Sequence, residues 1–335
     1  MADTGKVCVM GGGSWATAIA KMLQSHPGTE INWYMRKPAQ IRQFKQLGHN
    51  PKYLTLVDFD LDRIHFYSNI NLAVKNSDTL VFVTPSAFLK SHLNKLKTND
   101  LHDKIIVTAI KGIVPDENML VSQYFHRFYQ VPFENIVALA GPCHAEEVAY
   151  ERLSYLTFAG YDLELARRVA ALFACRYVKP TITQDVSGIE FGSTLKNVYA
   201  IASGICHGLK YGDNFQAVLV ANAIEEMNRF VAAACPGVER DIVKSVYLGD
   251  LLVTSYSKFS RNRTFGTMIG RGYSVRTAQL EMEMIAEGYY GTKCIKELND
   301  TIYHVEMPIM EAVYNVLYNR IAASIEIKLL SEHLH

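Results

Sequence analysis

Two polar clusters interrupt apolar helical patterns in the second half of the chain, and their residue types fit proton transfer. Lys196 and Asn197 are flanked by apolar residues, and a lysine on a buried helix is costly unless it is paired or its pKa falls. Asp250 precedes another apolar run, where it is either a helix N-cap or the partner that keeps Lys196 ordered. A lysine in such a place could protonate a carbonyl oxygen and, in reverse, take the proton from an alcohol.

A short basic segment follows the second cluster. Ser260, Arg261 and Asn262 supply donors for a phosphate, and an arginine can grip two oxygens at once. Taken alone, Arg261 and Asn262 are better explained as part of a solvated loop. Together with Lys196 and Asp250 they predict a reaction at the carbonyl group of a substrate with an anionic tail.

A glycine-rich loop near the N-terminus points to the second reactant, a dinucleotide whose nicotinamide would transfer a hydride to that carbonyl carbon. Residues 11–16, GGGSWA, fit G-x-G-x-x-A and lie between an expected strand and an expected helix. Gly11 allows the tight turn, Gly13 lets the backbone approach a pyrophosphate, and Ala16 lets the helix pack closely on the strand. A turn that merely needs glycines explains neither this placement nor this spacing. The loop therefore predicts a dinucleotide site, with the anion at the positive end of the helix.

The end of the second expected strand bears on the choice of cofactor. NAD-specific sites often place Asp or Glu there, whereas this chain has Arg36 and Lys37. A cation can meet the 2′-phosphate of NADP, and the alternative is a solvated strand end. We expect NADP(H) as the cofactor, alone or alongside NAD(H).

Lys111 and residues 141–146 follow two further expected strands. Ligands of an open parallel sheet bind beyond the carboxyl ends of its strands. Lys111 comes directly after the apolar run KIIVTAI, and although a strand-end lysine is often only solvated, we expect this one to face the ligand.

The elements that must position these residues indicate two domains. Short β-rich runs alternate with helical patterns in the first half, which predicts a largely parallel sheet covered by helices. The expected strands are 6–10, 31–36, 64–68, 79–84, 104–110, 135–140, 153–159 and 177–183. The expected helices are 16–24, 87–96, 118–129, 163–173, 189–207, 214–234, 240–256, 283–299 and 308–319. We expect an α/β Rossmann domain over residues 1–186 and an all-α substrate domain over residues 187–335.

Composition argues against several other classes of protein. The 335 residues carry a net charge of +1, so no global field recruits nucleic acid or anionic lipid. The six cysteines form no C-x-x-C pair and the eleven histidines no H-E-x-x-H pattern, which favours reduced thiols and no metal site. No apolar run is long enough to span a bilayer and no secretory signal is recognisable, so we expect a cytoplasmic protein.

Seven segments occur in an order that points to one family: GGGSWATAIA (11–20), AIKG (109–112), AGPCHAEEVA (140–149), LKNVYAIASGICHGL (195–209), GDLLVTSYSKFSRN (249–262), AEG (286–288) and EMPIMEAVYNVL (306–317). With them the chain resembles the bacterial NAD(P)-dependent glycerol-3-phosphate dehydrogenases over nearly its whole length. The resemblance implies a Rossmann domain, a helical C-terminal domain and a homodimer. It also implies reduction of dihydroxyacetone phosphate for glycerophospholipid synthesis.

The resemblance further implies roles for individual residues. Lys196 would be the proton acceptor and donor, supported by Asp250 and Thr254. The residues expected to contact the substrate are Lys111, Gly141, Cys143, Asn197, Ser260, Arg261 and Asn262. Beside Gly11 and Gly13, the residues expected to contact the dinucleotide are Ser14, Trp15, Arg36, Lys111, Ala145, Arg261, Ile285 and Glu287.

Two residues depart from the family pattern. Cys143 stands where the family usually has Ser, so a backbone N–H would have to serve there, and Ala16 replaces a Gly at a site that needs only a small residue. Residues 43–62 contain no clear motif, and we assign them no role.

Three other functions are open at this point. A 6-phosphogluconate or β-hydroxyacid dehydrogenase joins the same two kinds of domain, but the basic cluster at residues 260–262 favours our first choice. A methyltransferase would be expected to have an acidic residue in place of Arg36. An inactive NAD(P)-binding sensor would not need both Lys196 and Asp250.

Overall fold

The computed structural model describes residues 4–282 and 286–335. The chain divides into two compact units, described separately below. The first comprises Met1–Ile110 and Val121–Val186, and the second comprises Lys111–Leu120 and Ser187–His335. Lys111 thus belongs to the same unit as Lys196.

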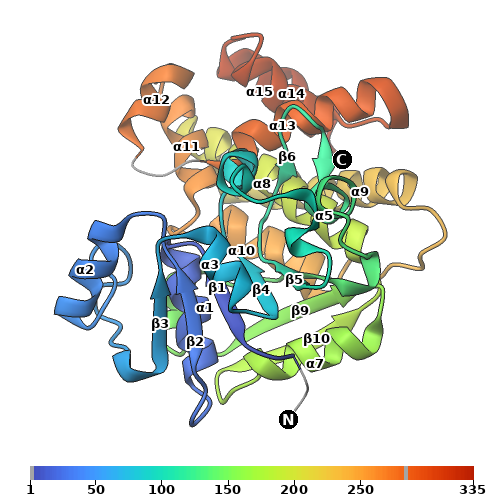
Figure 1. Ribbon diagram of the computed structural model, residues 1–335. Helices are drawn as coiled ribbons and strands as arrows, with labels where there is room; N and C mark the ends of the chain where they lie inside the picture. The colour runs from blue at the N-terminus through green and yellow to red at the C-terminus, as the bar shows by residue number, and fades with distance from the viewer. Residues whose placement is uncertain (1–3, 283–285) are drawn as a thin grey trace. The chain divides into compact units, whose positions relative to one another are not determined.

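An eight-stranded sheet forms the centre of the first unit (Figure 1), with the order β10-β9-β8-β5-β4-β1-β2-β3. Only β8 and β9 are antiparallel; the other neighbouring strands run parallel. The strands are β1 (Val7–Met10), β2 (Ile31–Tyr34), β3 (Ile64–Tyr67), β4 (Thr79–Phe82), β5 (Ile105–Thr108), β8 (Ile136–Ala140), β9 (Ser154–Gly160) and β10 (Val178–Thr183). The predicted Rossmann-type sheet is confirmed, and every residue of its central strands β1, β4 and β8 is buried because both faces are covered.

Helices cover this sheet on both faces. From β1 the chain proceeds through β2 to β3 at one edge of the sheet. It then returns to β4, beside β1, and proceeds through β5 to β8 in the opposite direction. Because the crossovers are right-handed, α1 lies on one face and α3, α4 and α5 lie on the other. The helix α1 packs against α6 and α7. The helices of this unit are α1 (Ser14–Gln24), α2 (Pro38–Leu47), α3 (Ile70–Lys75), α4 (Leu89–Leu93), α5 (Val121–Tyr129), α6 (Ala145–Ala149) and α7 (Leu163–Phe173).

The second unit is helical, as predicted, and is built around one long buried helix. Every residue of α8 from Gly188 to Cys206 is buried. The helices are α8 (Val186–Gly208), α9 (Gly212–Ala234), α10 (Asp250–Tyr256), α11 (Arg261–Gly270), α12 (Val275–Glu281), α13 (Glu287–Leu298), α14 (Pro308–Leu317) and α15 (Ala323–Ser331). A small antiparallel hairpin, β6 (Ile113–Val114) with β7 (Met119–Leu120), completes the unit.

Several expected helices begin or end elsewhere in the structure. The expectation for residues 118–129 is wrong at its start, because Met119 and Leu120 pair with β6. The expectation for residues 240–256 is also wrong at its start. The Asp241 side chain accepts from the backbone N–H of Val243 in a turn, and the helix begins with a π-helical turn over Ser245–Gly249. Residues 283–285, at the start of another expected helix, lie outside the described residues.

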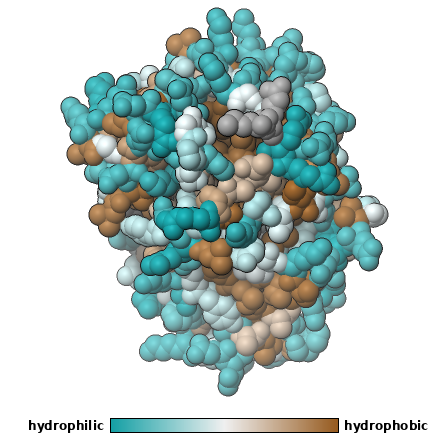
Figure 2. All heavy atoms as spheres, turned by 90° about the horizontal axis from the view of Figure 1, so that it is seen from below, coloured by the Kyte–Doolittle hydropathy of each residue, from teal (hydrophilic) through white to brown (hydrophobic). Residues whose placement is uncertain are grey.

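The molecular surface combines polar and apolar residues. The face drawn in Figure 2 is mostly hydrophilic, with separate apolar patches among the polar residues. Scattered exposed apolar side chains are normal for globular proteins. Among the helices that the structure describes, none has the length and apolar character required to cross a membrane.

Candidate active site

Lys196 and Asp250 form a buried ion pair in the second unit. Lys196 lies on α8 and donates from Nζ to Oδ1 of Asp250, the first residue of α10. Lys111 Nζ lies 3.6 Å from Asp250 Oδ2, so one carboxylate faces two ammonium groups. Asp250 is 1% exposed and Lys196 3% exposed, and buried charges of this kind must be paired. Of the two interpretations of Asp250, the one as the partner of Lys196 is confirmed. The interpretation as an N-cap is wrong, because the Asp250 side chain caps no helix.

The surroundings of Lys196 lower its pKa towards neutrality. Burial lowers the pKa of Lys196 from 10.5 to about 7, because desolvation penalises the ammonium form. The Asp250 carboxylate opposes this effect, and the Lys111 ammonium adds to it. A lysine whose pKa lies near neutrality can both donate and accept a proton under ordinary conditions.

A chain of amide side chains continues from this ion pair. Asn197 Nδ2 donates to the backbone carbonyl of Lys111 at 3.3 Å. Asn262 Nδ2 donates to Asn197 Oδ1 at 2.9 Å, and Asn262 Oδ1 accepts from the backbone N–H of Gly288, also at 2.9 Å. Thr254 Oγ1 donates to the backbone carbonyl of Asp250 at 2.6 Å. The network fixes the orientation of both asparagines and so joins α8, α10, α11 and α13.

Close packing of backbones allows these asparagines to meet. A Cβ on Gly204 of α8 would overlap the backbone carbonyl of Arg263, and a Cβ on Gly266 of α11 would overlap that of Ile201. A Cβ on Gly288 would lie 2.5 Å from the carbonyl oxygen of Asn197. Only glycine permits such an approach. We call this contact of α8 with α11 and α13 the glycine seam.

The basic segment starts α11 rather than forming a loop. Ser260 is the N-cap of this helix, and its side chain accepts from the backbone N–H of Arg263 at 3.3 Å. Arg261 is exposed while Asn262 is buried, so the two neighbours face different surroundings. Glu287 is the first residue of α13. Ile285, another expected contact of the dinucleotide, lies outside the described residues.

The glycine loop of the first unit has room for a large anion. Gly11 adopts φ +149°, and a Cβ there would lie 2.6 Å from the carbonyl oxygen of Val83, so this position requires glycine. A Cβ on Gly13 would meet no described atom within 4 Å outside its chain neighbours. Space in front of the N-terminus of α1, which begins at Ser14 and Trp15, fits the pyrophosphate of a dinucleotide.

A second turn of the first unit carries three more expected contacts. Gly141 follows β8 with φ +138°, and a Cβ there would lie 2.6 Å from the carbonyl oxygen of Tyr155. The Cys143 thiol donates to that same oxygen at 3.3 Å, and Ala145 is the first residue of α6. The Cys143 side chain is thereby engaged with the protein itself.

Arg36 is exposed just beyond β2, where its charge acts on the half-buried His92. Burial and, second, the Arg36 guanidinium lower the pKa of His92 to about 4. His92 Nδ1 lies 3.0 Å from Thr84 Oγ1 in a hydrogen bond. The side chain of His92 is therefore neutral at physiological pH, and Arg36 and Lys37 are exposed cations at this strand end.

Sequence reasoning missed side chains that hold the glycine loop. Trp33 Nε1 donates to the carbonyl of Gly11 at 2.7 Å, and Thr17 Oγ1 donates to that of Gly13 at 2.9 Å. Both residues lie in otherwise apolar segments, so the signal was a hydrogen-bonding group on a side chain expected to be buried.

Elsewhere, the part of the chain that the structure describes holds no group of three or more His, Cys, Asp or Glu residues arranged for a metal. All six cysteines are free thiols.

Two family models match the chain, and between them they cover most of it. The model described as the NAD-dependent glycerol-3-phosphate dehydrogenase N-terminus matches residues 6–166, and the one for the C-terminus matches residues 185–328. Glycerol-3-phosphate dehydrogenase (NAD(P)+) of Carboxydothermus hydrogenoformans is 34% identical over 93% of this chain and 92% of its own. The enzyme of the same name from Lysinibacillus sphaericus is 34% identical over 97% and 95%. The crystal structure of glycerol-3-phosphate dehydrogenase from Coxiella burnetii shares the fold, with a TM-score of 0.89 and 24% identity over 98% of this chain and 99% of that one.

Proposed function

The chain belongs to the NAD-dependent glycerol-3-phosphate dehydrogenase family, and we propose that Lys196 transfers the proton in its reaction. The protein is an NAD(P)-dependent oxidoreductase that interconverts dihydroxyacetone phosphate and glycerol 3-phosphate. The observation that carries our proposal for Lys196 is its complete burial beside Asp250, with its pKa lowered towards neutrality. Burial without a function would favour an apolar residue at this position.

The proposed chemistry divides between the cofactor and the second unit. The nicotinamide supplies a hydride to the carbonyl carbon, or accepts one from the alcohol. The Lys196 ammonium gives its proton to the developing alkoxide, and the neutral amine takes the proton back in the reverse direction. Asp250 favours the charged form of Lys196, whereas Lys111 favours the neutral form of Lys196. With burial, these two neighbours therefore set the pKa of Lys196.

The polar groups around Lys196 are suited to orienting a phosphorylated substrate. Asn197 and Asn262 are fixed by the amide chain, and their network extends to Lys111. Arg261 stands exposed at the N-terminus of α11, where a guanidinium and the positive end of a helix both attract a phosphate. Thr254, bonded to the carbonyl of Asp250, would hold the turn that presents the carboxylate.

We assign the dinucleotide to the domain of residues 1–186 and the substrate chemistry to that of residues 187–335. Gly11 and Gly13 give the loop its shape and its space. Arg36 is placed to meet a 2′-phosphate, which would let the enzyme use NADPH. For Gly141, Cys143 and Ala145 we propose contacts through backbone groups, since the Cys143 thiol already binds Tyr155. Ser14, Trp15 and Glu287 remain proposed contacts of the dinucleotide, as does Ile285.

Three aspects of the biological setting extend this proposal. We propose a homodimer, located in the cytoplasm, whose product supplies glycerophospholipid synthesis. Membership of the family is the observation that supports each of them.

A coupled measurement tests the activity directly. The purified protein is mixed with NADPH or NADH and dihydroxyacetone phosphate, and the absorbance of the reduced cofactor is followed. We expect oxidation that depends on the phosphorylated ketone, and no comparable rate with dihydroxyacetone, which lacks the phosphate. A rate no higher than the background without substrate would contradict the assignment.

A further inference from the structure

The segment that follows α2, to which the sequence analysis gives no role, reaches the glycine loop through one buried side chain. Asn50 is 0% exposed, and its Nδ2 donates to the carbonyl of Gly12 at 3.2 Å and to Thr17 Oγ1 at 2.8 Å. Gln40, on α2, donates to the same Gly12 carbonyl at 2.9 Å. Two amide side chains from outside the β1–α1 unit therefore converge on the middle residue of the loop.

With Trp33 and Thr17, these amides hold three consecutive carbonyl groups. Trp33 binds that of Gly11, Asn50 and Gln40 bind that of Gly12, and Thr17 binds that of Gly13. In a planar trans peptide the C=O and the following N–H point in opposite directions. Fixing these carbonyls therefore aims the N–H groups of Gly12, Gly13 and Ser14 away from the protein side chains that hold them.

From this arrangement we infer that Asn50 and Gln40 are positioning residues for dinucleotide binding. The inference rests on the use of NAD(P) stated above. Backbone N–H groups that point away from the surrounding side chains, at the start of a helix, are the donors that an anion needs there. Glycine is the most flexible residue, so a loop of three glycines keeps this direction only if other groups fix it. Asn50 and Gln40 do so without adding charge near the pyrophosphate.

Asn50 also has a local structural role, which an experiment must separate from the proposed one. Its Oδ1 accepts from the backbone N–H groups of Lys52 at 3.1 Å and Tyr53 at 3.3 Å, which stabilises the turn. Asn50→Asp keeps this acceptor but removes the donor to Gly12, and it adds a negative charge. Gln40→Ala removes the second donor to Gly12 without a charge. It also removes a 3.4 Å hydrogen bond to Asn50 Oδ1, but keeps the bonds of that oxygen to Lys52 and Tyr53.

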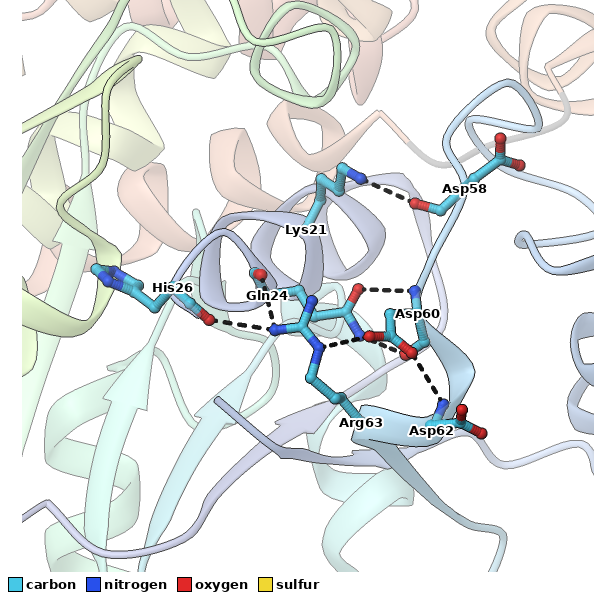
Figure 3. A network of polar contacts seen from close by, with 7 residues as sticks. All are labelled: Lys21, Gln24, His26, Asp58, Asp60, Asp62 and Arg63. Atoms are coloured by element: carbon cyan, nitrogen blue, oxygen red, sulfur yellow. Dashed lines mark hydrogen bonds and ion pairs between the residues drawn. The ribbon is translucent and has the colours of Figure 1, made fainter. Parts of the chain in front are cut away.

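The chain offers a matched control at the far end of the same segment (Figure 3). Gln24, the last residue of α1, donates to the carbonyl of Asp60 at 2.6 Å and accepts from its N–H at 3.1 Å. Lys21 and Arg63 add contacts between the end of α1 and this segment. Gln24→Ala thus loosens the segment's attachment to α1 without touching the carbonyls of residues 11–13.

The experiment measures NADPH dissociation constants by fluorescence titration, together with unfolding midpoints and kcat at saturating NADPH, for the parent protein and the three variants. We expect NADPH affinity to fall about tenfold in Gln40→Ala and further in Asn50→Asp. We expect kcat to stay within about twofold, and Gln24→Ala to lower the midpoint but keep the parent affinity. Loss of affinity in Gln24→Ala as large as in Gln40→Ala, or parent affinity in Gln40→Ala, would overturn the inference. A parent protein that binds neither NADPH nor NADH would instead contradict the proposed function.

Discussion

The glycine loop of the first unit and the lysine site of the second solve different electrostatic problems. The loop is held by an indole, a hydroxyl and two amides, all of them neutral. The lysine site consists of one carboxylate between two ammonium groups, all of them more than three-quarters buried. A site that must bind a permanent anion can rely on oriented N–H groups. A site that must move a proton needs a group whose charge can change, and therefore needs charged neighbours.

The largest effect should come from removing the titrating group. Lys196→Met keeps the length and apolar stem of the side chain, and Asp250 retains Lys111 as a partner. We expect kcat to fall about a thousandfold, within the usual range for a lost general acid. The dissociation constant for NADPH should change less than about twofold, because the loop is built separately. A kcat near that of the parent protein would remove the proposed role of Lys196.

Next in size is the expected effect on substrate affinity at α11. Arg261→Ala should raise KM for dihydroxyacetone phosphate about tenfold to a hundredfold, through the loss of charge-assisted hydrogen bonds to the phosphate. Arg271→Ala, at the opposite end of the same helix and also exposed, is the control and should leave KM unchanged. Equal effects of the two substitutions would show that net charge, rather than position, attracts the substrate.

A smaller effect is expected for the cofactor phosphate in the first unit. Arg36→Ala should raise KM for NADPH about tenfold and leave KM for NADH nearly unchanged, since only NADPH carries the 2′-phosphate. Lys37→Ala tests the neighbouring cation in the same assay. If Arg36→Ala affects both cofactors equally, Arg36 supports the strand end rather than the choice of cofactor.

The charged neighbours of Lys196 should shift its pH dependence in opposite directions. Reduction uses the ammonium form, so its rate is lost as pH rises through the pKa of Lys196. Asp250 raises that pKa and Lys111 lowers it. Asp250→Asn should therefore move the loss of kcat to lower pH, and Lys111→Met to higher pH, each by about one unit or more. Profiles of kcat at saturating substrate check this, and shifts of the same sign in both variants would contradict it.

Glu226 provides the mildest test, since its carboxyl is buried and hydrogen-bonded to backbone N–H groups, with Arg229 as a charged neighbour. Its carboxylate accepts from the N–H groups of Ile309 and Met310 at the start of α14, at 2.8 and 3.0 Å. Burial raises the pKa of Glu226 from 4.5 to about 7 despite these bonds. The folded state thus binds more protons than the unfolded state between these values, and this stability is lost as pH rises through about 7.

We therefore expect the free energy of unfolding to decrease between pH 5 and pH 8 by about 1–3 kcal/mol more in the parent protein than in Glu226→Gln. Denaturant titrations across this range give the slopes. The two slopes should be compared rather than the absolute stabilities, because Glu226→Gln also replaces one of the two oxygens that accept backbone N–H groups. Identical slopes would show that Glu226 stays ionised in the folded protein.

The sheet was predictable from the sequence, whereas several helices were not. The central strands β1 and β8 are short apolar runs that are fully buried, and their positions follow from that requirement. The helices that were not predicted include α2, α12 and α15, which bury few residues, so apolar periodicity gave only a weak signal there. They also include α3, α6 and α11. The hairpin of β6 and β7 consists of two-residue strands, which are too short for a pattern to appear.

The contacts of the lysine site were only partly predictable. A buried lysine requires a partner, so the pairing of Lys196 with Asp250 could be proposed as one of two alternatives. The sequence does not indicate that Lys111 contacts the same carboxylate, because this contact depends on the tertiary fold that brings Lys111 close to α8. Asn50 could not be found at all, because its segment lacks a motif and its function depends on the backbone that it contacts.

The glycine seam has a mechanical consequence for the asparagines of the second unit. At Gly204 and Gly266, where α8 meets α11, the nearest atoms of the facing helix are all backbone atoms, which cannot change rotamer; at Gly288 of α13 they are the backbone of Asn197 and the side chain of Ile201. The spacing between Asn197 and Asn262 is therefore as stiff as the helices themselves. We expect the amide hydrogens of this stretch of α8 to be among the slowest in the protein to exchange with solvent deuterium, so that the seam loosens only when the whole unit unfolds.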